Sequence, residues 1–269
     1  MNLIIRGIDC MEVKFLNPGV DYMIRRIMEF QSEDESTFWS EPLYHFYPQI
    51  DKAYATSLPF PERKNYLEQT LRTIYVELED TINEKVDLYS QHWANCKAQI
   101  TAALSDAFGM NCYDLFNDLR CNVSMNPIEP RFLKEQCFDI FYLNSERGAI
   151  GESIHEIVHF VWFYVWNRLF GDSYDEYERP SLKWVLSEVI VESVMKDERL
   201  SSINPYFPRE HGGCIYPYFF DMEVEGKLIL DTLDVMYKTQ CIDDFMRNSY
   251  AYCQAHEEKI RAHIRKSEG

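Results

Sequence analysis

The segment from His155 to His159 reads His-Glu-Ile-Val-His, and the residues on either side of it are typical of a helix. Positions four apart lie on the same face of a helix, so His155 and His159 can offer two imidazole nitrogens to one metal ion. Glu156 lies about 100° further around the helix axis, from where its carboxylate can reach a water molecule on that metal. Two imidazoles and a carboxylate with this spacing favour zinc. The chain is therefore expected to fold around a helix that presents these three side chains to a metal.

A second helix is expected from Leu182 to about Asp197, and it carries two glutamates in an apolar sequence. Glu188 and Glu192 are four positions apart, which places them on one face of this helix. An unpaired carboxylate is costly to bury, so both side chains need partners. A metal ion and an imidazole that binds it are such partners, which links this helix to the first one.

Two strands are expected before the first helix, at Arg120–Met125 and Cys137–Leu143, because residues that favour strands alternate or cluster there. The first helix itself is expected to start around Gly151 and to end near Phe170, where Gly171 follows. The short distance between the second strand and the helix indicates that the metal site lies close to a sheet.

The first third of the chain shows apolar residues at helical spacing, in Asp21–Phe30 and in a long run from Glu62 to Phe108. The long run is expected to break once, because helices of that length are uncommon in globular domains. A closing helix is expected at Ile242–Ile264. The sequence thus predicts a mostly helical α+β fold, with a helical N-terminal region at residues 1–118 and, at residues 119–269, a core with a small sheet, the two site helices and the C-terminal helix.

The two helices resemble the active-site helices of the gluzincin zinc metallopeptidases, which carry H-E-x-x-H on one helix and a glutamate ligand on the next. The resemblance implies a zincin-like core in which His155, His159 and Glu188 hold a zinc ion. It implies that Glu156 is the general base for a metal-activated water that hydrolyses bonds in a peptide or protein substrate. It also implies that Glu192 lies against His155 and supports it.

The resemblance covers roughly residues 137–195, and one spacing departs from the best-known members of the clan. Twenty-eight residues separate His159 from Glu188, which is a longer gap than in those members, and Glu192 is the alternative third ligand. The acidic loop at residues 171–179 can absorb the difference, because surface loops tolerate insertions at modest cost in free energy.

Two related classes of zinc peptidase fit the sequence less well. The metzincins need glycine and histidine at positions that Trp162 and Val165 occupy here. The G-x-M-E-N signature of exopeptidases is not found in the sequence, which disfavours an aminopeptidase.

A peptidase also needs a donor for the oxyanion that forms on the substrate and a way to hold the peptide. His211 and Tyr216 are the candidates for the donor, because they belong to a loop whose glycines permit close approach to a substrate. The segment Phe138–Leu143 is expected to hold an extended peptide by pairing along a free strand edge.

The composition limits the other partners. A net charge of −17 makes nucleic acid or an anionic membrane an unsuitable partner. The most apolar stretch, Phe160–Trp166, is too short to cross a bilayer. The N-terminus lacks the pattern of a secretory signal, so a cytoplasmic protein with eight reduced cysteines is expected. The sequence pattern defines neither an oligomeric state nor the sequence of the substrate.

Two other classes of protein compete with the peptidase. The first is a non-catalytic zinc-binding protein, regulatory or structural, in which Glu192 or a cysteine completes four protein ligands. The second is a metal-free helical interaction domain, in which His155 and His159 pack in the core and Glu156 pairs with Arg147 or Arg168.

Overall fold

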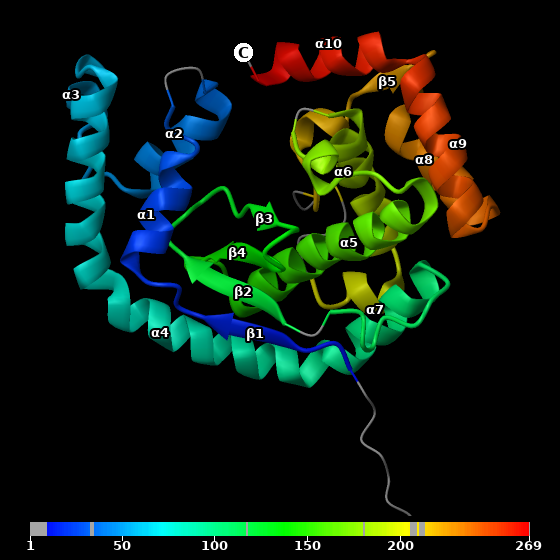
Figure 1. Cartoon of the computed structure of the whole chain (residues 1–269), viewed down its shortest axis with the longest axis horizontal. Helices are drawn as coiled ribbons and strands as arrows, with labels where there is room; N and C mark the ends of the chain where they lie inside the picture. The colour runs from blue at the N-terminus through cyan, green and yellow to red at the C-terminus, as the bar shows by residue number, and fades with distance from the viewer. Residues whose placement is uncertain are drawn as a thin grey trace, which may run out of the picture.

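The computed structural model describes residues 10–32, 35–116, 118–179, 181–204, 209 and 213–268, and Figure 1 shows how its elements are arranged. In chain order the elements are β1 (Val13–Leu16), α1 (Val20–Met28), α2 (Thr37–Phe46), α3 (Lys52–Ser57), α4 (Phe60–Ala107), β2 (Leu119–Ser124), β3 (Arg131–Phe132), β4 (Cys137–Phe141), α5 (Glu146–Phe170), a 3-10 turn (Tyr174–Tyr177), α6 (Leu182–Met195), α7 (Glu198–Ser201), a second 3-10 turn (Pro217–Phe219), β5 (Glu223–Val224), β6 (Lys227–Leu228), α8 (Ile229–Thr239), α9 (Ile242–Ala255) and α10 (Glu257–Glu268). The predicted class, mostly helical α+β with a small sheet, is confirmed.

The main sheet has four strands in the order β1-β2-β4-β3, with β1, β2 and β4 parallel and β3 antiparallel. Strands β2 and β4 confirm the two predicted strands. Strand β1 was not expected, and it brings the N-terminal region into the sheet by pairing Val13 with Leu119. The division into two regions at residue 118 stays a prediction.

The prediction that Phe138–Leu143 offers a free edge to a peptide is wrong. Strand β4 lies inside the sheet, where β2 pairs with one side of it and β3 with the other. Beyond β3, the amide of Asp139 donates to the carbonyl of Pro130 at 2.9 Å, and the amide of Phe141 donates to the Glu129 carboxylate at 2.7 Å. On this side of the sheet, the edge strand is therefore β3 and not β4.

Helix α4 runs for 48 residues without the predicted break. Its only proline, Pro61, lies in the first turn, where proline is tolerated, and no glycine interrupts the rest. Figure 1 shows that the helix changes direction sharply before it passes along β1. The predicted C-terminal helix, in contrast, is divided into α9 and α10 at His256.

Helix α5 lies at the centre of the molecule, in contact with β4, α4, α6 and α9 (Figure 1). It starts at Glu146 rather than Gly151, because the Ser145 hydroxyl caps it by accepting from the amide of Gly148 at 3.0 Å. It ends as predicted, with Gly171 in the left-handed conformation at φ 70°. Its apolar residues occupy every face, as expected for a helix that is surrounded by protein.

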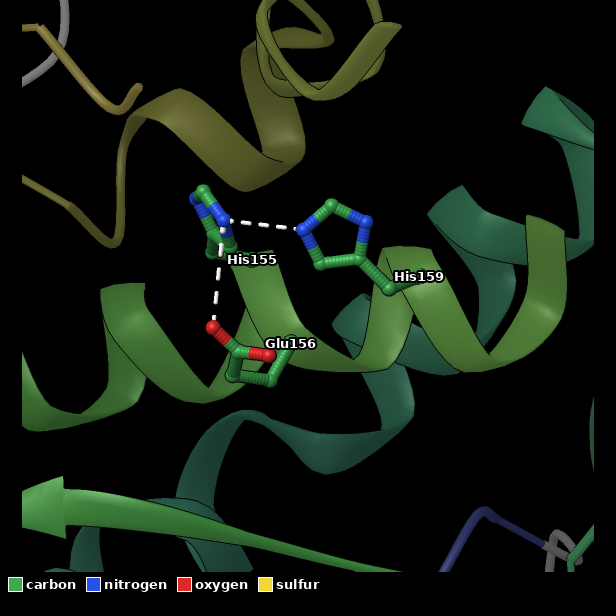
Figure 2. A group of neighbouring side chains, drawn as sticks. All are labelled: His155, Glu156 and His159. Atoms are coloured by element: carbon green, nitrogen blue, oxygen red, sulfur yellow. Dashed lines mark hydrogen bonds and ion pairs between the residues drawn. The ribbon is translucent and has the colours of Figure 1, made fainter. Parts of the chain in front are cut away.

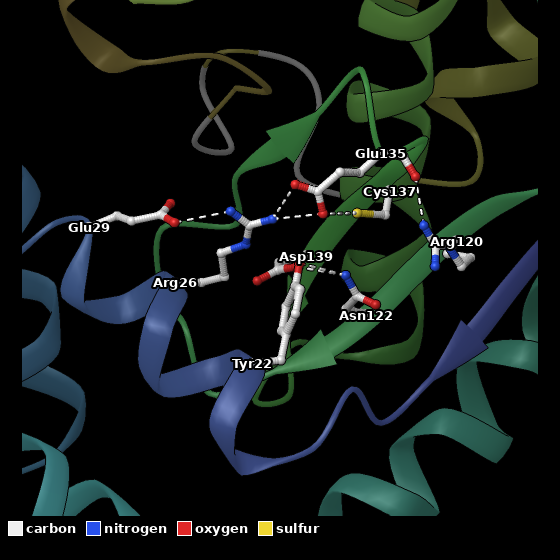
Figure 3. Close-up of polar contacts among 8 residues, drawn as sticks. All are labelled: Tyr22, Arg26, Glu29, Arg120, Asn122, Glu135, Cys137 and Asp139. Carbon is white, nitrogen blue, oxygen red and sulfur yellow. Dashed lines mark hydrogen bonds and ion pairs between the residues drawn. The ribbon is translucent and has the colours of Figure 1, made fainter.

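A polar network joins α1 to the sheet (Figure 3). The buried carboxylate of Asp139 accepts from the Tyr22 hydroxyl at 2.8 Å and from the Asn122 amide at 3.0 Å. Burial raises the pKa of Asp139 to about 7. Arg26 from α1 donates to both oxygens of Glu135, at 2.7 and 2.9 Å. These bonds fix the face of the sheet beside the site.

None of the helices in the described part of the chain has the length and apolarity that a bilayer crossing demands.

Gly151 lets the loop after α7 approach α5 one turn before His155. A Cβ atom at this position would lie 2.5 Å from Cγ of Asn204, whose side chain is buried. Gly151→Ala is therefore expected to lower the free energy of unfolding by about 1–3 kcal/mol through overpacking, measured by chemical denaturation. Adding Asn204→Ala should recover part of that loss. A Gly151→Ala protein as stable as the wild type would contradict this close approach.

Candidate metal site

The three residues of the motif lie on α5 as predicted, and Figure 2 shows them with both imidazole rings turned toward each other. Nε2 of His155 lies 3.0 Å from Nε2 of His159. It also lies 3.8 Å from Oε1 of Glu156, which approaches from the side. The side chains of His155 and Glu156 are 12% and 8% exposed, and the His159 side chain is fully buried. Their ligand atoms lie within 4.8 Å of one another, close enough to share one ion.

Glu188 reaches the same point from α6. One of its oxygens, Oε2, lies 3.5 Å from Nε2 of His155, and the other, Oε1, lies 3.5 Å from Nε2 of His159. Oε2 is buried and has no hydrogen-bond partner among the described residues. The structure therefore brings Glu188 to both histidines across the long gap in the sequence.

These distances fit a tetrahedral zinc site. Zinc binds imidazole nitrogen and carboxylate oxygen at about 2.0–2.1 Å, which places neighbouring ligand atoms about 3.3 Å apart. The 3.0 Å between the two Nε2 atoms, and the 3.5 Å from each of them to a different oxygen of Glu188, are close to that value. Two neutral imidazoles and one carboxylate are also a donor set that zinc accepts in catalytic sites. The residues present thus fit a zinc ion.

A backbone carbonyl fixes the orientation of the first histidine. Nδ1 of His155 lies 2.6 Å from the carbonyl oxygen of Cys214. Because a carbonyl can only accept, Nδ1 carries a proton and donates it, which leaves Nε2 as the nitrogen that faces His159 and Glu188. This is the arrangement that orients a metal-binding imidazole. His159 differs, because its Nδ1 is buried without a hydrogen-bond partner among the described residues.

The carboxylates make the space between the rings attractive to positive charge. Burial opposes a charge on His155, but Glu188 and Glu156 outweigh burial and raise the pKa of His155 to about 9. Burial, assisted by Arg131, lowers the pKa of His159 to about 3. Burial raises the pKa of Glu156 to about 7, although His155 and Arg131 act in the opposite direction.

Arg131, from β3, is a site residue that the sequence did not reveal. Its guanidinium donates to Oε1 of Glu188 at 3.0 Å, and both side chains are almost fully buried. Burial would raise the pKa of Glu188, but His159, His155 and Arg131 hold it well below its ordinary value. Arg131 therefore keeps Glu188 ionised and fixes one of its oxygens.

Glu192 does not lie against His155, and this prediction is wrong. Its carboxylate accepts from Arg209 at 2.5 and 2.6 Å and pairs with Lys196 at 3.1 Å. The sequence had suggested that a metal site would neutralise the buried Glu192 carboxylate. Arg209 and Lys196 neutralise it instead. The nitrogen of His155 that faces away from the other ring meets the Cys214 carbonyl instead.

The remaining predicted residues are placed as follows. His211 lies outside the described residues. Tyr216 lines two hollows next to the site together with Glu156. Arg168, which one alternative paired with Glu156, pairs with Asp243 at 3.3 Å.

The two hollows flank Glu156. The larger, of about 380 Å³, is lined by three arginines, several aromatic side chains and four glutamates, among them Arg131 and Trp39. The smaller, of about 260 Å³, also includes His155. Ile128, Glu129, Glu156 and Tyr216 line both. The carboxylate of Glu156 thus lies where the hollows meet.

Comparison with known proteins finds no matching family model, no matching curated protein and no matching solved structure. The case for a function therefore rests on the geometry of the site itself.

The geometry predicts different effects for the two glutamates of α6. Glu188→Gln is expected to weaken zinc binding at least about tenfold, because it removes a charged ligand, whereas Glu192→Gln should change it by less than about twofold. Competition with a zinc chelator gives both affinities, and circular dichroism checks that each variant is folded. The assignment of Glu188 fails if both variants bind zinc as the wild type does.

Proposed function

We propose that this chain is a zinc-dependent peptidase of the gluzincin type, with a zincin-like core that holds the ion through His155, His159 and Glu188. The observation that carries the proposal is the cluster that two imidazoles and one carboxylate form on two packed helices. The two Nε2 atoms lie 3.0 Å apart, and each lies 3.5 Å from one oxygen of Glu188. The placement of Glu156 beside this cluster and between two hollows supports a catalytic role for the site.

Glu156 is suited to move a proton during hydrolysis. Zinc in such a site supplies Lewis acidity, which activates water and polarises the carbonyl of the scissile bond. Oε2 of Glu156 is buried and without a hydrogen-bond partner among the described residues, so it is free to accept the proton of the attacking water. As the C–N bond breaks, the carboxyl returns the proton to the leaving amine nitrogen. A pKa of about 7 suits both steps near neutral pH.

The surroundings of Glu156 suit an extended substrate. The two hollows that meet at Glu156 provide room on both sides of a scissile bond. Strand β3, an edge of the sheet, lines the larger hollow with Arg131 and Phe132, and an edge strand can pair with a peptide backbone. Tyr216 lines both hollows, where its hydroxyl is a candidate to stabilise the oxyanion.

A purely structural zinc site is the weaker alternative. It requires a fourth protein ligand, and the sequence offered Glu192 or a cysteine for that role. Glu192 is held by Arg209 and Lys196, and within the described residues the metal-binding group contains histidine and glutamate but no cysteine. Cys214 contributes its backbone carbonyl rather than its sulfur.

Two variants separate binding from catalysis. His155→Ala is expected to lose the zinc, because it removes one ligand and leaves the other two facing an empty position. Glu156→Gln is expected to keep near-stoichiometric zinc and to lower peptide hydrolysis about 10²–10⁴-fold, because the amide cannot accept the proton. Elemental analysis gives the zinc content, and mass spectrometry of a peptide library gives the hydrolysis. Full zinc retention by His155→Ala, or unchanged turnover by Glu156→Gln, would contradict the assigned roles.

A further inference from the structure

The smaller hollow is acidic in a way that the catalytic role of Glu156 does not explain. Three carboxylates line it, from Glu129, Glu152 and Glu156. No lysine or arginine is found among the described residues of its lining. The larger hollow also contains glutamates, but it has Arg26, Arg131 and Arg179 among them. The described lining of the smaller hollow therefore has three carboxylates but no arginine to balance them, and His155 is its one basic side chain.

The three carboxylates come from α5 and from the loop before β3. Glu152 precedes His155 by three residues on α5, so it points to the same side of the helix. Glu129 is fixed because its Oε1 accepts from the Phe141 amide at 2.7 Å and from the Asn144 amide at 2.6 Å. Glu156 is 6% exposed, and its Oε2 has no hydrogen-bond partner among the described residues.

The three groups repel one another. Burial, followed by the charge of Glu152, raises the pKa of Glu129 above its ordinary range. Like charges that lie close together beside buried side chains are unfavourable unless a cation joins them or one of them takes up a proton. The described lining has no lysine or arginine, and His155 alone does not match three carboxylates, so a cation from outside is a partner that would relieve the repulsion.

The arrangement suits an organic ammonium better than a second metal ion. A metal needs ligand atoms that converge on one point, and neither Glu129 nor Glu152 belongs to the group of ligand atoms within 4.8 Å that surrounds the histidines. The lining also includes apolar side chains, among them Pro127, Ile128 and Ile215. An ammonium group attached to a carbon skeleton matches acidic and apolar walls together.

We propose that the smaller hollow binds an ammonium group of the peptide substrate beside the scissile bond, with Glu152 and Glu129 as its main partners. The ammonium belongs to the free amino terminus of the peptide or to a lysine side chain. This inference rests on the proposed function, because it takes the hollow as one end of a peptide-binding cleft.

Binding of small amides tests the ammonium site without any turnover. The probes are leucinamide, which has a free amino terminus, Nα-acetyl-lysinamide, which has only a side-chain ammonium, and the neutral N-acetyl-leucinamide. Calorimetry on the zinc-supplemented full chain at neutral pH should show at least one of the ammonium compounds binding tenfold or more tightly than the neutral one. The compound that binds more tightly identifies the source of the ammonium.

A matched pair of variants locates the site. Glu152→Gln is expected to remove most of the preference for the ammonium compound, whereas Glu146→Gln, which makes the same change on the exposed first turn of the same helix, should keep it. Equal binding of all three probes by the wild type overturns the proposal, and so does an equal effect of the two variants. The comparison of probes on the wild type decides the matter even if a variant fails to fold.

The two proposals fail in different ways. An ammonium preference in a protein that hydrolyses no peptide would contradict the peptidase and leave the ammonium site standing. Hydrolysis with no preference for peptides that carry a free amino terminus or a lysine beside the scissile bond would contradict the ammonium site alone.

Discussion

The contact between α5 and α6 determines what this molecule can do, because it places a buried carboxylate against two buried imidazoles. Glu188 faces Nε2 of His155 and of His159, each at 3.5 Å. A buried carboxylate in this position needs positive charge nearby, and Arg131 supplies one unit through Oε1. Its other oxygen is left without a hydrogen-bond partner among the described residues, on the side of His155. A zinc ion between Glu188 and the two imidazoles would add the positive charge that this oxygen lacks.

The local part of this site could be predicted from the sequence. The spacing of His155 and His159 fixes their common face on any helix, and the apolar neighbours of Glu188 indicate that its helix is buried. Glu152 could also have been found, since it lies one turn before His155 on the same side. The limits of α5 were less predictable, because they depend on a cap at Ser145.

What the sequence could not reveal depends on tertiary contacts. Arg131 comes from a two-residue strand with no pattern of its own, and the partner of His155 is a backbone carbonyl that any residue could provide. Glu192 was misplaced because one of its cations, Arg209, lies 17 residues later in the sequence. Strand β1 pairs with a segment about one hundred residues later, and such distant pairing leaves little local signal. The sequence therefore indicated that Glu188 and Glu192 are buried and need partners, but it did not reveal the arginines that bind them.

X-ray absorption at the zinc edge, on protein prepared with zinc and without chelators, tests the central claim most directly. The account predicts one zinc per chain with nitrogen and oxygen neighbours at about 2.0–2.1 Å and the outer scattering of two imidazoles. Sulfur neighbours at about 2.3 Å would contradict the assigned ligands, since they indicate a cysteine site. Protein that takes up no zinc would contradict the metal site itself.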